Sequence, residues 1–286
     1  MKNFEESIKA AKDQLTLHHY DSKPELVYAL SGFAKNPAYR AKIVDYIKTG
    51  FDQLREETKK RAEKNKYDHL INQIMFGALG RLAAMIGENS LSPLIYKEFI
   101  FAGDNDQFFE LNVETGTLAI ALSILGYTGD LTEFKKVLDH WESVYEDRQK
   151  FVTEMYYALW ILKQDKSGPM VYLKDSKHKT NLSYVAAALA DLDVKSALAV
   201  LNEKIIQIKN PVTKEVFLEA VTRLGNQKIN PIADERMIWM FGKLSSTEIA
   251  LGNESDNEFI RRAMEKTKNM ELGIVYEVDD SSKEDL

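Results

Sequence analysis

Residues 151–162 read FVTEMYYALWIL, and this stretch ends in a short phrase that recurs along the chain. In the phrase an alanine precedes an apolar residue, and another apolar residue follows three positions later. The copies are Ala29-Leu30 with Phe33, Ala78-Leu79 with Leu82, Ala121-Leu122 with Leu125, Ala158-Leu159 with Leu162, Ala188-Leu189 with Leu192 and Ala220-Val221 with Leu224. Successive copies lie roughly 30 to 49 residues apart, a period typical of two-helix repeat units. The sequence therefore predicts a series of helix pairs.

The apolar residues between these phrases have the spacing of amphipathic helices. In residues 131–144 they recur at intervals of three and four positions, at Leu131, Phe134, Val137, Leu138, Trp141 and Val144. No segment alternates apolar and polar residues at every second position, as a half-buried strand would. The chain has only 6 prolines and 14 glycines, few turn residues for a β-rich or Rossmann-like protein. The predicted fold class is all-α.

A single helical-repeat domain is expected over residues 1–275. Within it we predict a first helix from Asn3 to Leu17 and an unusually long one from Ala38 to Lys64. The segment Gly103–Asp106 interrupts the helical pattern and is predicted to form a loop. Residues 276–286 are polar and acidic and cannot bury enough apolar area to offset the entropy of ordering, so we expect a disordered tail.

Two stretches carry a resemblance to a known family. Asp147-Arg148 leads into Tyr157–Leu162, and Pro211-Val212 leads into Glu219–Gly225. Helix pairs of this period that close on Ala-Leu-x-x-Leu resemble the HEAT family of helical repeats, over most of the chain. The resemblance implies a right-handed α–α superhelix, or solenoid, of about six to seven helix pairs with a concave surface. The family's Asp and Val-Arg signature between helices is mostly missing, so armadillo-like and irregular helical arrays stay open.

Composition narrows the classes of partner. The formal net charge is −6, with 38 basic and 44 acidic residues, whereas nucleic-acid binding usually needs a concentrated basic face. No apolar run approaches the roughly 20 residues that span a bilayer, and the first residues lack the apolar core of a signal peptide. We therefore expect a cytoplasmic protein without membrane association, and the charge argues against nucleic acid as its main partner.

The sequence shows no motif for catalysis or for cofactor binding. HExxH, GxGxxG, GxxxxGK[ST] and GxSxG motifs are all missing. The chain contains no cysteine, which excludes disulfides, thiolate metal sites and a cysteine nucleophile. We expect no catalytic centre, no metal site and no cofactor.

Aromatic residues mark a candidate binding surface. On a helical projection of 151–162, Tyr157 and Trp160 lie opposite the core stripe, together with Lys150. An exposed Tyr and Trp one turn apart are typical anchors at binding sites, although neighbouring helices could instead cover both rings. In a HEAT-like array this helix would line the concave surface. The binding candidates there are Tyr157, Trp160, Lys150, Arg148, Lys214 and Arg223.

The leading hypothesis is a non-catalytic scaffold that binds a protein or peptide on the concave surface of the solenoid. One alternative is a nucleic-acid-acting HEAT-like protein of the DNA glycosylase type, which the net charge opposes. Another is an all-helical enzyme, such as a lyase, or a small-molecule binder, which a deep pocket with convergent polar groups would favour. The oligomeric state is left open.

Overall fold

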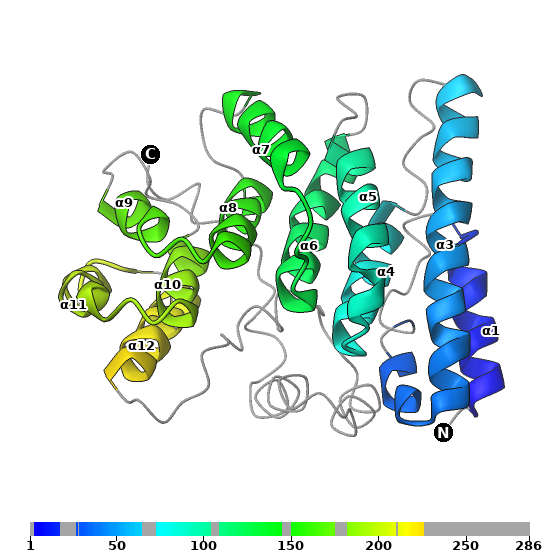
Figure 1. Ribbon diagram of the computed structural model, residues 1–286, viewed down its shortest axis with the longest axis horizontal. Coiled ribbons are helices and arrows are strands. Elements are labelled where there is room, and N and C mark those ends of the chain that lie inside the picture. The colour runs from blue at the N-terminus through cyan, green and yellow to red at the C-terminus, as the bar shows by residue number, and fades with distance from the viewer. Residues whose placement is uncertain are drawn as a thin grey trace.

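The computed structural model describes residues 3–17, 27, 29–64, 73–103, 109–144, 150–174, 182–209 and 211–225, and every structural statement below concerns these residues. Their regular structure is helical throughout, which confirms the predicted all-α class (Figure 1). The predicted tail 276–286, residues 104–106 of the predicted loop and Arg148 lie outside the described part of the chain.

The helices follow the predicted segments closely. The long helix begins at Pro37 and ends at Lys64, and the first helix is shorter than predicted, ending at Gln14. The α-helices are α1 (Phe4–Gln14), α3 (Pro37–Lys64), α4 (Gln73–Met85), α5 (Ser92–Gly103), α6 (Phe109–Leu125), α7 (Thr132–Val144), α8 (Lys150–Lys163), α9 (Gly168–Lys174), α10 (Leu182–Asp191), α11 (Leu198–Ile205) and α12 (Pro211–Gly225). The 3₁₀ helices are η1 (Ala29–Lys35), η2 (Asn89–Leu91) and η3 (Lys195–Ala197).

The repeated alanine phrase falls in alternate helices, namely α4, α6, α8, α10 and α12, with its first copy in η1. We call the five α-helices the repeat helices. Their phrase alanines are all buried: Ala78, Ala121, Ala158, Ala188 and Ala220. The repeat helices pack against one another in chain order, α4 on α6, α6 on α8, α8 on α10 and α10 on α12. The small alanine side chains let neighbouring helices approach at these contacts.

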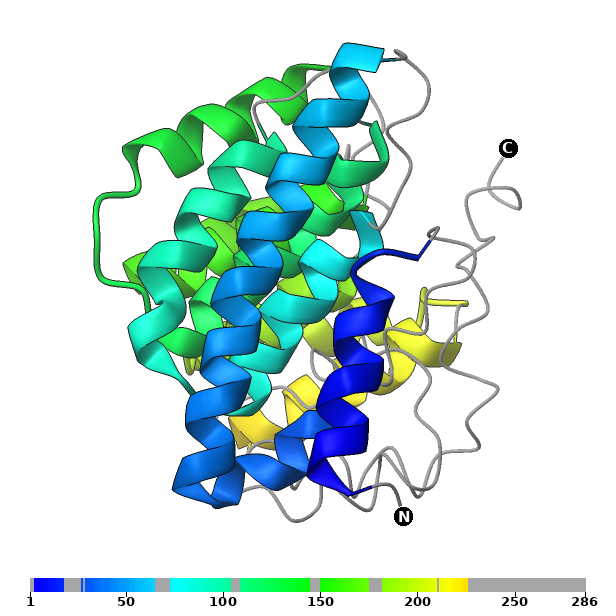
Figure 2. The same ribbon diagram turned by 90° about the vertical axis from the view of Figure 1, so that its right-hand side faces the viewer.

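The intervening helices form a second row. α5 packs on α6 and α7, α7 on α8, α9 on α10, and α11 on α12. Figure 1 shows the helices crossing the molecule in chain order, from α1 and α3 at one end to α11 and α12 at the other. In the perpendicular view of Figure 2, α1 and α3 lie at the near end of this series.

A capping box closes the N-terminal end of α1. The Asn3 side chain accepts a hydrogen bond from the Glu6 backbone N–H, and the Glu6 carboxylate accepts one from the Asn3 N–H. At the other end of α1, Tyr46 of α3 donates a hydrogen bond to the Ala11 carbonyl, 3.0 Å away. These contacts fix α1 against α3.

Two of the repeat helices are followed by a glycine in the left-handed backbone conformation. Gly87 has φ 62° just after α4, and Gly126 has φ 64° just after α6. Glycine has no Cβ and adopts this conformation without strain, so it is common one residue past a helix end. The Glu88 N–H then reaches back to the Ala83 carbonyl, and the Tyr127 N–H to the Leu122 carbonyl. The glycine turns therefore reverse the chain between the two rows.

Helix α7 confirms the amphipathic pattern predicted for residues 131–144. Phe134, Val137, Leu138 and Trp141 are buried, whereas Val144 at the helix end is exposed. The Trp141 indole N–H donates to the Gly103 carbonyl at 2.9 Å, which ties α7 to the end of α5.

The central repeat helices are covered on all sides. In α10 every residue from Leu182 to Ala190 is buried, and residues 114–123 of α6 are buried as well. A helix that is apolar over its whole circumference is typical of the interior of a protein. Among the described helices, none combines the length and the apolar character needed to cross a bilayer.

Candidate functional site

Tyr157 and Trp160 are buried, so the expectation that these rings are exposed is wrong. Tyr157 is 0% exposed, and its hydroxyl donates to Oδ2 of Asp191 at 2.6 Å. Trp160 packs between the rings of Tyr156 and Tyr172, with centroids 5.5 Å and 5.6 Å away. The helical projection placed both rings on the side of α8 opposite the core stripe. In the structure, α10 and α9 pack against α8. Neighbouring helices cover both rings, which confirms the other of the two interpretations of this aromatic pair.

Arg223 is also buried, and it meets the same carboxylate. Its Nη2 lies 2.5 Å from Oδ1 of Asp191, and the two side chains are 3% and 5% exposed. Asp191 at the end of α10 thus joins α8 and α12, through Tyr157 and Arg223. We call these three residues the Asp191 cluster. The sequence prediction placed Tyr157 and Arg223 at one surface, and the structure brings them together in the interior instead.

A second buried carboxylate lies beside the Asp191 cluster on the same helices. Tyr184 of α10 donates a hydrogen bond to Oε1 of Glu154 on α8, 2.8 Å away. A Cβ on Gly116 of α6 would come within 2.1 Å of Oε2 of Glu154. The missing side chain of Gly116 therefore makes room for this carboxylate. The Glu154 side chain thus lies where α6, α8 and α10 meet.

Of the other predicted binding residues, Lys214 is the one whose side chain the structure describes. Lys214 lies on the exposed side of α12. Lys150 is the first residue of α8, but its side chain lies outside the described part, as does all of Arg148. The structure therefore brings Tyr157 and Arg223 together and separates Lys214 from them.

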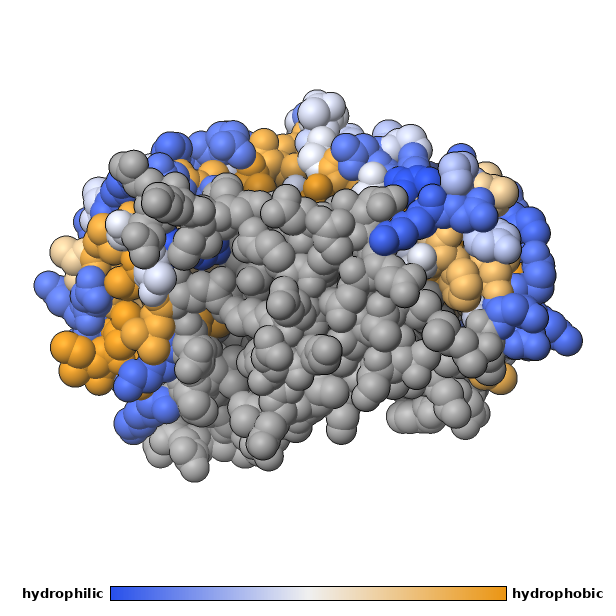
Figure 3. Space-filling view, turned by 90° about the horizontal axis from the view of Figure 1, so that it is seen from below, coloured by the Kyte–Doolittle hydropathy of each residue, from blue (hydrophilic) through white to orange (hydrophobic). Residues whose placement is uncertain are grey.

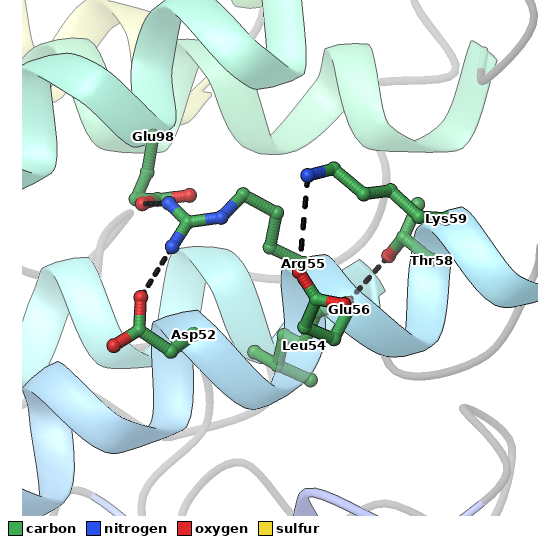
Figure 4. Close-up of polar contacts among 7 residues, drawn as sticks. All are labelled: Asp52, Leu54, Arg55, Glu56, Thr58, Lys59 and Glu98. Carbon is green, nitrogen blue, oxygen red and sulfur yellow. Dashed lines mark hydrogen bonds and ion pairs between the residues drawn. The ribbon is translucent and has the colours of Figure 1, made fainter.

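A third buried acid, Glu98, joins α5 to α3. Glu98 of α5 is 0% exposed and forms an ion pair with Arg55 of α3, whose guanidinium also binds Asp52 (Figure 4). Burial is the main reason that the pKa of Glu98 rises to about 7, against the lowering effect of Arg55. Among the described residues, the Oε2 atom of Glu98 has no hydrogen-bond partner.

These buried groups hold neighbouring helices together. Glu154 accepts a hydrogen bond from Tyr184, and Asp191 is bound by Tyr157 and Arg223. Within the described residues, no group of three or more His, Cys, Asp or Glu side chains is arranged to hold a metal ion. An open depression of about 500 Å³ lies at the start of α7, and it carries charges of both signs. Its lining residues are Gly129, Asp130, Leu131, Thr132, Lys135, Lys136, Asp139 and Lys163.

Two of the exposed large apolar side chains of the described residues lie on or beside α11 and α12, and the others, Ile74, Val144 and Val171, lie on α4, α7 and α9. Ile206, directly after α11, is 86% exposed, and Leu218 of α12 is 44% exposed. Lys204, Lys209 and Lys214 flank them in sequence, and Lys209 and Lys214 are exposed. Figure 3 shows hydrophobic surface beside hydrophilic surface at the end where α11 and α12 lie in Figure 1. Sequence reasoning selected Lys214 here and missed Ile206 and Leu218.

Comparison of the chain with protein-family models, with curated proteins and with solved structures gave no match.

Proposed function

We propose that this protein is a non-catalytic helical scaffold, a HEAT-like solenoid, that binds another protein at the turn between α11 and α12. The packing of the repeat helices in chain order supports the solenoid, because each unit then hides its apolar face mainly against its neighbours. The interior acids support a structural role, since Asp191 and Glu98 are held by arginines of neighbouring helices.

The exposed apolar residues at the turn carry the proposal. The central repeat helices are buried, whereas α12 exposes Lys214, Leu218 and Thr222 at intervals of four residues along one side. Ile206 lies in the short connection that leads into this helix. We call Ile206, Leu218, Lys204, Lys209 and Lys214 the α11–α12 surface. Exposed apolar groups with a polar rim are typical of sites that bind proteins.

The charges of this surface indicate the chemistry of the partner. Three lysines and one exposed acid, Glu203, flank two apolar side chains, so a complementary segment would present apolar residues bordered mainly by carboxylates. An amphipathic helix with acidic residues at the edges of its apolar face has this pattern, and helices commonly bind such surfaces through side chains spaced three and four apart. The lysines would mainly raise the association rate and set specificity.

Photo-crosslinking at the surface tests the proposal directly. A photoreactive amino acid is placed at position 218, and in a matched control at position 144, where Val144 is also exposed but lies on α7. We expect position 218 to crosslink a defined protein from native extract and position 144 not to. Leu218→Asp and Ile206→Asp should each reduce capture of that protein at least tenfold, and Val144→Asp should leave it unchanged.

Two results would contradict the proposal. Equal crosslinking from positions 218 and 144 would show that the α11–α12 surface is not selective. Capture that disappears after nuclease treatment would show that the three lysines bind nucleic acid and that no protein partner contacts this surface directly.

A further inference from the structure

An open depression lies between the start of α7 and the end of α8, two helices that pack on each other (Figure 1). Its volume of about 500 Å³ lies within the range of sites that bind small molecules, roughly 300–1,000 Å³. Lys135 and Asp139 line it one turn apart on α7, and Lys163, the last residue of α8, lines it from the other helix. Charged side chains of two helices therefore meet at one hollow.

Two of the three lysines that line the depression are not used elsewhere in the described part of the chain. Lys136 forms an ion pair with Glu133, 2.6 Å away. Lys135 and Lys163 are exposed, and neither has a hydrogen-bond or ion-pair partner among the described residues. Lys163 lowers the pKa of Asp165 only through its charge, after the hydrogen bonds that this carboxylate accepts. Two positive charges are therefore available to a ligand.

The first turn of α7 is already satisfied by protein groups. Oδ1 of Asp130 accepts hydrogen bonds from the Thr132 hydroxyl at 2.8 Å and from the Thr132 N–H at 3.0 Å. These contacts hold the pKa of Asp130 below its ordinary value, so the carboxylate stays ionised while it caps the helix. The Phe134 N–H donates to the Tyr96 hydroxyl. An anion in the depression would therefore depend on the lysine side chains and not on these amides.

The charges of the depression favour a doubly charged ligand group. Asp139 is exposed and follows Lys135 by four residues, so its charge opposes the lysines in part. A phosphate group carries a charge of about −1.5 to −2 at pH 7, and a net positive site attracts it more strongly than it attracts a carboxylate. Leu131 is half-buried in the lining and offers apolar surface to an organic portion beside the phosphate.

We propose that this depression binds the phosphate group of a small phosphomonoester, which Lys135 and Lys163 contact from two helices while Leu131 packs against the organic portion. Lysine suits this role because its ammonium group donates three hydrogen bonds and carries a compact charge. The inference goes beyond the protein-binding role proposed above, since the depression shares no residue with the α11–α12 surface.

Isothermal titration calorimetry of the full chain with phenyl phosphate tests the proposal, at pH 7.5 in a buffer without phosphate. We expect a Kd below about 1 mM. Benzoate has the same ring and a single charge, and inorganic phosphate lacks the ring, so both should bind more weakly. Lowering the pH to 5 removes a charge from phenyl phosphate and should also weaken binding. Equal affinity for benzoate or inorganic phosphate would overturn the ligand class, and no binding at 1 mM would overturn the site.

Four variants place the ligand in the depression. Lys135→Met and Lys163→Met should each raise the Kd at least about threefold, as expected for loss of an exposed charge pair. Asp139→Asn should lower the Kd, because it removes a charge that opposes the phosphate. Lys195→Met, an exposed lysine of η3 that does not line the depression, is the control and should leave the Kd unchanged. All four replace exposed side chains, and circular dichroism checks that each variant folds. Unchanged binding in both Lys135→Met and Lys163→Met, weaker binding in Asp139→Asn, or an equal loss in Lys195→Met would contradict the site.

Discussion

Arg223 of α12 and Asp191 of α10 form an ion pair in the interior, with Nη2 and Oδ1 2.5 Å apart and both side chains almost fully buried. Asp191 accepts a second hydrogen bond from Tyr157 of α8, so one carboxylate connects three successive repeat helices. α12 is the last helix that the structure describes, and this contact fixes its position relative to α8 and α10. The geometry of the α11–α12 surface therefore depends on a contact in the protein interior.

Breaking the ion pair should destabilise the protein strongly. Arg223→Met leaves the Asp191 carboxylate buried without its cation, and loss of one member of a buried pair costs about 3–5 kcal/mol. Urea unfolding followed by circular dichroism should show this loss in the free energy of unfolding. Lys214→Met, on the exposed side of the same helix, is the control and should change it by less than about 0.5 kcal/mol. A loss below about 1 kcal/mol for Arg223→Met would mean that Asp191 is not held by Arg223.

Tyr157 should matter for stability and not as a binding anchor. Tyr157→Phe keeps the ring and removes only the hydroxyl that donates to Asp191. A hydrogen bond to a charged group contributes about 1.5–3 kcal/mol, and we expect a loss in this range. Tyr156→Phe also removes a hydroxyl bound to a carboxylate, that of Glu142, but in a half-buried position, so its effect should be smaller. If Tyr157→Phe and Tyr156→Phe lower the free energy of unfolding by the same amount, the result would argue against the burial of the Asp191 cluster.

Gly116 should not tolerate a methyl group. A Cβ at this position would lie 2.1 Å from Oε2 of Glu154 and 2.8 Å from the Cα of Phe151, so α6 and α8 would have to separate. Alanine gains about 1 kcal/mol in helix propensity over glycine, but overpacking typically costs about 1–3 kcal/mol. We expect Gly116→Ala to lower the melting temperature. Gly225→Ala, where nothing lies within 4 Å of the added Cβ, should leave it unchanged or raise it.

Local sequence patterns were enough to predict the helices. The alanine phrase and the apolar spacing depend on residues close in sequence, and the structure places the phrase in the repeat helices and buries Phe134 and Trp141 of α7 as predicted. The polar contacts were not predictable in the same way. A helical projection shows that Tyr157 points away from the core stripe, but it does not show that another helix lies on that side. Contacts between distant helices decide this.

The sequence nevertheless contained a signal for the acids that were missed. Asp191 follows the apolar run from Tyr184 to Ala190, and Glu98 lies within the apolar segment from Leu94 to Phe101. A helix without a polar side is typical of the interior, so a lone carboxylate in or beside it is a candidate for an ion pair with another element. This argument would have selected Asp191 and Glu98, but it would not have identified Arg223 and Arg55 as their partners.

The last prediction concerns acid stability and Glu88, which closes the turn after α4. Its carboxylate accepts hydrogen bonds from Ser90 Oγ at 2.6 Å and from Arg40 Nε at 3.0 Å, and Arg40 also donates to the Ile86 carbonyl. The hydrogen bond from Ser90 is the largest cause of a lowered pKa at Glu88, and Arg40 lowers it further. The folded state therefore prefers the ionised form. This stabilisation is present above pH 4.5 and is lost as the pH falls below it.

Glu88→Gln should remove this contribution. At pH 7 we expect the free energy of unfolding to fall by about 1 kcal/mol, the size of a partly exposed charge-assisted hydrogen bond. The difference between the wild-type protein and the variant should shrink as the pH falls from 5 to 3, measured by urea unfolding at each pH. Glu5→Gln, which removes an exposed acid bound to Lys42, should show almost no difference at any pH. A difference for Glu88→Gln that grows toward pH 3 would mean that the turn after α4 favours the protonated acid, which the contacts of Arg40 and Ser90 oppose.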